Sequence, residues 1–160
     1  MGRRETIAAA TAPKKPADRC LYDADYYAWV QAQVSALERK EIAALDLAHL
    51  ADEVADLGRA QKRAVRSNLG VLLPHLIKWT YQPDRRKGGW ESSIREHRDR
   101  LREELADSPS LRGYAEQLLE DQYRRARLRA GDQMRKSVKS VPQSCPFTMR
   151  EVLDPHFLPK

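Results

Sequence analysis

The longest helical pattern in the sequence limits the fold more than any other feature. From Leu47 to about Trp79, apolar residues recur at steps of three and four, as they do on one face of an α-helix. An unbroken helix over 47–81 would extend roughly 50 Å. Pro74 lies within the pattern, four residues after Gly70, and the period continues beyond both. Because an internal proline removes one hydrogen bond and crowds the preceding turn, we expect a kink there rather than an end.

Three further main helices are predicted. The first follows Asp23 or Asp25 as N-cap, the next starts around Trp90, and the last starts at Pro109. The expected apolar face of the first of these comprises Tyr27, Val30, Val34 and Leu37. Since no strand pattern or internal repeat is found, we predict an all-α fold, a bundle of four main helices with a kinked long second helix.

The end of the chain predicts a short C-terminal helix. Thr148 and Glu151 have the spacing of a capping box, in which each side chain bonds the other residue's backbone. This places a helix at about 149–153, and we expect Phe157 and Leu158 to pack the tail onto the bundle.

Composition sets the domain organisation and the compartment. The chain has 160 residues, enough for one domain, which we place at 21–159 after a disordered basic leader at 1–20. No apolar run approaches the ~20 residues of a membrane span, and the N-terminus is too polar for a secretory signal. Two cysteines without metal-ligand spacing are typical of a reducing compartment. We therefore expect a cytoplasmic protein with no membrane partner.

The net charge of +6 is unevenly distributed along the chain. Residues 21–58 carry two basic and eight acidic side chains, a net charge of −6, whereas residues 59–102 carry twelve and four, a net charge of +8. Two explanations are open. Helices of opposite charge pair within the chain or across a dimer, or an exposed basic face binds an anionic partner.

Four blocks of the sequence carry a family resemblance. They are YDADYYAWV at 22–30, LADEVADLG at 50–58, LLPHLIKWTYQPDRRKGGWESSIREHRDRL at 72–101 and CPFTMREVLDPHFLP at 145–159. Together they resemble the bacterial family catalogued as domain of unknown function 29, over about residues 21–159. The resemblance implies an all-helical fold with no established activity, so no catalytic residue is carried over. Gly88 and Gly89 replace the polar residues usual in that family, which could loosen the turn before Trp90.

The turn that follows the long helix is the strongest candidate for a binding site. Cations bind phosphates and aromatic faces stack on bases, so this turn suits a nucleic acid. The candidate residues are His75, Lys78, Trp79, Tyr81, Arg85, Arg86, Lys87 and Trp90. The structural alternative is that Trp79 and Trp90 pack in the core while the cations are solvated or paired. No nucleic-acid-binding motif is visible in the sequence.

Metal binding and catalysis have weaker support. His49 and Glu53 are four residues apart and share a helix face, but the Glu-x-x-His signature of di-metal bundles is absent, so we predict no metal and no cofactor. His75 would act as a base only with a partner from another helix, for which Glu96, Asp99 and Asp121 are candidates.

A protein-interaction module requires the fewest additional features, because long amphipathic helices and charge blocks suit docking or self-association. We predict this function first, with a protein or a second copy as the partner. Nucleic-acid binding through the turn at 78–90 is the alternative. An enzyme or metal-binding bundle with a site near His75 or at His49 and Glu53 is the remote alternative.

Overall fold

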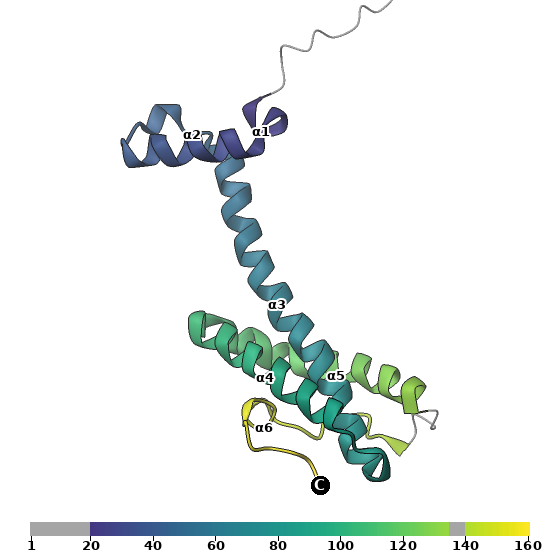
Figure 1. Cartoon of the computed structure of the whole chain (residues 1–160). Coiled ribbons are helices and arrows are strands. Elements are labelled where there is room, and N and C mark those ends of the chain that lie inside the picture. The colour runs from purple at the N-terminus through teal and green to yellow at the C-terminus, as the bar shows by residue number, and fades with distance from the viewer. Residues whose placement is uncertain (1–19, 135–139) are drawn as a thin grey trace, which may run out of the picture. The chain divides into compact units, whose positions relative to one another are not determined.

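The computed structural model describes residues 20–134 and 140–160, and these residues form helices and loops with no strand (Figure 1). The elements are α1 (Leu21–Ala24), α2 (Tyr26–Glu38), η2 (Ile42–Ala44), α3 (Leu47–Tyr81), η3 (Pro83–Arg85), α4 (Gly88–Asp107), η4 (Pro109–Leu111), α5 (Arg112–Met134) and α6 (Met149–Leu153). The predicted all-α class and its four long helices are confirmed. The predicted leader at 1–20 lies outside the described residues except for Cys20.

Contacts divide the chain into two compact units, Met1–Val54 and Ala55–Lys160. In its described part, the first unit comprises α1, α2, η2 and the first turns of α3. The second unit comprises the rest of α3 and all later elements. This division does not test the single domain that we expected over 21–159, which stays a prediction.

Helix α3 continues through Pro74, as the apolar period predicts. Asp46 caps its first turn by accepting a 3.3 Å hydrogen bond from the backbone N–H of His49. The predicted kink stays a prediction. The apolar face of α3 is buried only in its second half, from Val65 to Ile77, whereas Val54 and Leu57 are exposed.

Our prediction of which face of α2 is buried is wrong. Asp25 caps this helix as predicted, accepting a 2.9 Å bond from the N–H of Ala28. Tyr27, Val34 and Leu37 are nevertheless 73%, 44% and 51% exposed. The buried residues are Trp29, Gln33 and Ala36. The indole of Trp29 accounts for this orientation, because it is a large buried ring whose N–H donates a 3.2 Å bond to Asp46.

The second unit has one continuous core to which α3, α4, α5 and α6 all contribute. Its apolar α4 residues are Ile94, Leu101 and Leu105, while Trp90, which we considered as a core residue, is only half-buried. Tyr123 of α5 is fully buried, and its hydroxyl donates a 2.9 Å bond to the Pro142 carbonyl.

The C-terminal helix has the predicted capping box. The backbone N–H of Glu151 donates to the Thr148 hydroxyl at 3.2 Å, and the N–H of Thr148 donates to the Glu151 carboxylate at 2.8 Å. These backbone and hydroxyl donors lower the pKa of Glu151. Phe157 and Leu158 pack against the core as expected, so the tail belongs to the second unit.

Candidate functional site

The cation we expected at the start of the basic turn is instead part of the interior. Lys78 is buried, and its Nζ donates a 2.9 Å hydrogen bond to Oε1 of Gln133. The same atom lies 5.1 Å from the centroid of the Trp90 ring, a cation–π distance. Burial lowers the pKa of Lys78. Its ammonium therefore links α3 to α4 and α5 within the second unit.

Arg86 forms a second contact between a cation and an aromatic ring of this turn. Its Nε donates a 3.0 Å bond to the carbonyl of Trp79, and its guanidinium carbon lies 5.0 Å from the centroid of that ring. Arg85 and Lys87 are exposed, and Tyr81 is half-buried. The structure thus groups Lys78 with Trp90 and Arg86 with Trp79. Binding of a ligand by the eight candidate residues stays a prediction.

His75 lies one turn before Lys78 and has an unusual environment. Its Nδ1 is buried and has no hydrogen-bond partner among the described residues. Burial, followed by the charges of Lys78 and His97, lowers the pKa of His75 to about 4. The ring is therefore neutral at pH 7. The three acids considered as its partners each pair with an arginine of their own helix: Glu96 with Arg100, Asp99 with Arg102, and Asp121 with Arg124.

A cluster of polar and aromatic side chains holds the first unit together. Both oxygens of the Glu53 carboxylate are occupied, one by the hydroxyl of Tyr22 at 2.7 Å and the other by that of Tyr26 at 2.9 Å. The Tyr22 ring stacks on the His49 imidazole with centroids 4.0 Å apart. The bond to Glu53 is the main cause that raises the pKa of Tyr22 to about 12. The cluster fastens α1 and α2 to the start of α3.

His49 and Glu53 bind different partners: His49 contacts Asp46, whereas Glu53 accepts hydrogen bonds from Tyr22 and Tyr26. His49 Nδ1 lies 2.6 Å from Oδ2 of Asp46, and this bond is the main cause that lowers the pKa of Asp46. Within the described ranges, no group of three or more His, Cys, Asp or Glu side chains is placed to hold a metal ion. The contacts of His49 and Glu53 stabilise the packing of α1 and α2 on the first turns of α3.

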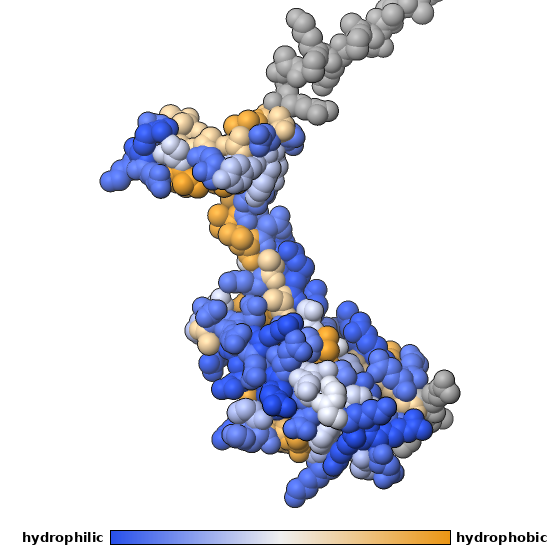
Figure 2. Space-filling view, in the orientation of Figure 1, coloured by the Kyte–Doolittle hydropathy of each residue, from blue (hydrophilic) through white to orange (hydrophobic). Residues whose placement is uncertain are grey.

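The first unit exposes most of the large apolar side chains that face solvent. Ten such side chains occur among the described residues, and eight of them belong to this unit. They are Leu21, Tyr26, Tyr27, Val34, Leu37, Ile42, Leu47 and Val54, which we term the apolar surface of the first unit. Figure 2 shows part of it in orange on α2 and the start of α3. Among the residues of this unit that the structure describes, only Trp29 and Ala36 are apolar and buried.

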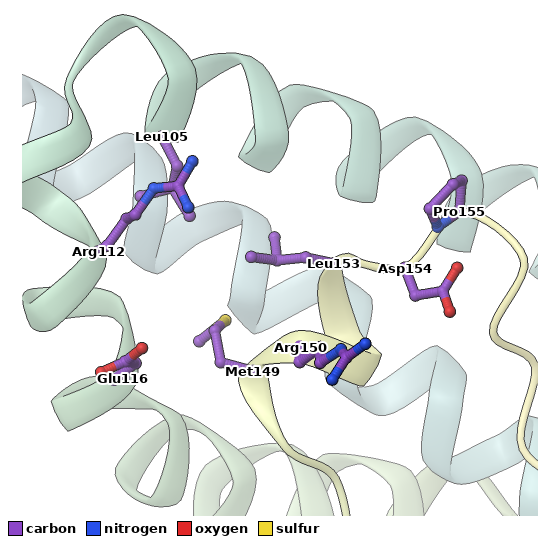
Figure 3. Close-up of a pocket in the computed structure, with 8 residues that line it drawn as sticks. All are labelled: Leu105, Arg112, Glu116, Met149, Arg150, Leu153, Asp154 and Pro155. Atoms are coloured by element: carbon purple, nitrogen blue, oxygen red, sulfur yellow. The ribbon is translucent and has the colours of Figure 1, made fainter.

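A cavity of about 490 Å³ opens beside α6 in the second unit (Figure 3). Met149 and Leu153 lie between two pairs of charged residues, Arg112 with Glu116 and Arg150 with Asp154. Since two cations and two anions line it, the cavity has no net charge from these groups. Its lining favours neither an anion nor a cation.

Sequence reasoning missed the most deeply buried charge of the second unit, Arg98. Its side chain is 2% exposed and donates to three carbonyls of the C-terminal tail. One signal was available, because position 98 lies between Ile94 and Leu101 on the apolar face of its helix. The roles of Tyr22 and Tyr26 were also missed, since nothing in the local sequence pairs them with Glu53.

The described residues define a small all-α protein in which most predicted site residues make structural contacts, and none of its helices is long and apolar enough to cross a membrane. The family model described as Domain of unknown function DUF29 matches residues 21–158, and the chain belongs to that family. This confirms the resemblance noted in the sequence. No curated protein and no solved structure matches the chain.

Proposed function

We propose that this protein is an interaction module whose first unit binds another protein chain, and that this chain is a second copy of itself. One observation carries the proposal: eight of the ten exposed large apolar side chains of the described residues gather on the first unit. Exposed apolar side chains that gather on one part of a protein are typical of protein-binding surfaces.

The small interior of the first unit supports the same conclusion. Its described part, residues 20–54, buries only Trp29 and Ala36 among its apolar residues. Small domains bury a low fraction of their surface and are only marginally stable unless a disulfide, a metal or association supports them. Cys20 is its one cysteine and is a free thiol, so no disulfide closes within the unit. Association would bury the apolar surface that the unit itself leaves open.

Charge favours a second copy as the occupant. The segments 21–58 and 59–102 have opposite net charges within one chain. The ion pairs within each segment include Arg39–Glu41, Arg100–Glu96 and Arg102–Asp99, each of which joins residues two to four positions apart. Such local pairs leave the overall charge of each segment in place, so two copies would attract each other through unlike segments.

Light scattering coupled to size exclusion, on protein treated with nuclease, tests self-association. We expect the wild type to have a dimer mass that declines on dilution. Val34→Gln with Leu37→Gln should shift it toward the monomer, because both side chains are exposed and their loss removes apolar contact without opening a core. The control is Leu128→Gln, which changes a residue that is also exposed, at 57%, but lies in the second unit. It should keep the dimer mass.

A monomeric wild type at every concentration would contradict the proposal, and so would a dimer that survives the double substitution unchanged. Far-ultraviolet circular dichroism checks that each variant is folded.

We also propose a bacterial cytoplasmic location, which the two free cysteines support. Fractionation of a bacterial host that expresses the gene natively tests the location.

A further inference from the structure

A groove between α3 and α5 in the second unit gathers arginines from two helices. Its volume is about 300 Å³. The lining residues are Arg63, Arg66, Ser67, Gly70 and Val71 of α3 and Gln122, Arg125 and Arg129 of α5, which together we term the arginine groove. Four of these eight residues are arginines, and no acidic side chain is among them. The helices thus bring together cations that are far apart in the sequence.

Gly70 keeps the floor of this groove low. A Cβ atom at this position would lie 3.5 Å from Oε1 of Gln122 and 3.9 Å from Nη1 of Arg129. These distances show that side chains of α5 reach across to the backbone of α3. The guanidinium of Arg129 therefore lies beside α3 and close to the floor, where it can meet the same ligand as Arg63 and Arg66.

The basic surface continues from the groove to an aromatic ring. Arg66 Nη2 donates a 3.0 Å bond to the hydroxyl of Tyr114, and Lys62 Nζ lies 5.3 Å from the centroid of that ring. Along α3, the distance from Lys62 to Gly70 is roughly 12 Å. A nucleic-acid strand carries one phosphate per ~3.4 Å of helix axis, so this length covers about three phosphates.

Nearby acids neutralise the groove only in part. Asp121 accepts from Arg124 at 2.7 Å and reaches Arg125 at a longer 3.5 Å. Asp56 bonds Arg59 at 2.6 Å, and its pKa is lowered chiefly by that bond. Each of these carboxylates thus has its shortest bond to an arginine outside the lining, and the lining arginines retain a surplus of positive charge.

We propose that the arginine groove binds the phosphodiester backbone of a nucleic acid. Guanidinium groups bind phosphate oxygens through paired N–H donors. A single phosphate needs only one or two of them, so several on one surface suit a ligand with successive phosphates. Tyr114 adds an aromatic ring at one end of the basic row, as in proteins that bind single strands. This site differs from the turn at 78–90, where Lys78 and Arg86 are occupied by internal contacts. It is also independent of the apolar surface of the first unit.

Fluorescence anisotropy with short labelled single-stranded DNA, single-stranded RNA and duplex DNA tests the proposal. We expect binding that weakens steeply between about 50 mM and about 200 mM salt, because each phosphate contact releases counterions. Three contacts would give a slope of log K against log salt of roughly −2 to −3. The three probes separate the sources of the backbone, and binding of any one of them supports the site.

Matched double variants localise the binding. Arg63→Gln with Arg129→Gln should weaken binding at least tenfold and reduce the salt slope by roughly 1.5 to 2. The control is Arg85→Gln with Lys87→Gln, which removes the same charge from exposed residues of the basic turn. It should retain most of the affinity. Both pairs are surface changes, and thermal unfolding confirms that each protein is folded.

Three results would overturn the proposal. The first is no binding of any probe at low salt. The second is an equal loss in both double variants, which would mean that the protein responds to net charge rather than to the groove. The third is binding of anionic phospholipid vesicles without binding of oligonucleotides. Failure of self-association would leave the test unaffected, because the groove belongs to the second unit alone.

Discussion

Arg98 Nε donates a 2.8 Å hydrogen bond to the carbonyl oxygen of Val152 and thereby joins α4 to the end of α6. The same guanidinium donates to the carbonyl of Phe157 at 2.8 Å and to that of Pro155 at 3.4 Å. Burial lowers the pKa of Arg98, while the charges of Asp154 and Asp99 oppose that shift. A buried charge is costly unless it is hydrogen-bonded, so the carbonyls of the tail stabilise the arginine as much as it stabilises them.

Replacing this arginine should loosen the tail. Arg98→Met keeps much of the apolar stem but leaves buried carbonyls without a donor, and we expect a loss of about 3 kcal/mol in the free energy of unfolding. Arg98→Lys should lose less, because it retains one charged donor but not the planar fork. Urea unfolding measures both. Arg95→Met, an exposed change on the same helix, is the control. Equal stability of Arg98→Met and the control would refute this role for the guanidinium.

The low pKa of His75 predicts a dependence of stability on pH. Between pH 6.5 and about 4, the unfolded chain binds a proton at His75 that the folded chain does not, so stability falls as pH is lowered through this range. The slope contributed by His75 is at most about 1.4 kcal/mol per pH unit. His75→Phe should flatten it. Thermal melting across this range measures the effect, with His156→Gln as the exposed control. An unchanged slope in His75→Phe would contradict the prediction.

The bond between Glu53 and Tyr22 predicts a change in alkaline titration. The carboxylate accepts a hydrogen bond from the phenol and its negative charge disfavours the phenolate, which is why the pKa of Tyr22 is raised to about 12. Glu53→Gln removes the negative charge, and Tyr22 should then ionise at a lower pH. Nuclear magnetic resonance of tyrosine ring carbons follows each residue separately. Tyr81 of the second unit, whose pKa is raised by burial, should titrate alike in both proteins. Titration of Tyr22 at the same pH in both would contradict the prediction.

Gly70→Ala should be tolerated and should stabilise the helix. The added Cβ would make ordinary van der Waals contacts at 3.5 Å and 3.9 Å. Glycine inside a helix costs roughly 0.5–1 kcal/mol relative to alanine, so we expect a gain of that order in the free energy of unfolding. Gly58→Ala, where the Cβ meets nothing within 4 Å, measures the helix effect without the contacts. A loss of stability confined to Gly70→Ala would show that the floor of the groove is tighter than these distances indicate.

Local rules recovered the helices of this chain well. The 35-residue helix α3 followed from a long apolar period, and α6 followed from the spacing of Thr148 and Glu151. Both signals lie within neighbouring turns of the chain. The buried face of α2 was predicted wrongly for the opposite reason. Its orientation depends on the bond from Trp29 to Asp46, which is seventeen residues away.

The candidate site was harder to predict, because the sequence shows which residues are charged but not where their long side chains place the charged group. Lys78 was expected to face a ligand, yet its stem carries the ammonium to Gln133, a residue of another helix. Arg125 and Arg129 went unremarked since nothing near them in the sequence relates them to Arg63. The arginine groove exists only through the pairing of α3 with α5, which no local pattern encodes.

The hydrogen bonds from Arg98 to the tail determine which sequence changes the tail can tolerate. Every acceptor is a main-chain carbonyl, at positions 152, 155 and 157, so the clamp does not depend on which side chains the tail carries there. It depends instead on the number of residues between the first and the last acceptor. The tail should therefore accept substitutions at its exposed positions 154–156 yet resist an insertion or deletion of even a single residue between positions 152 and 157.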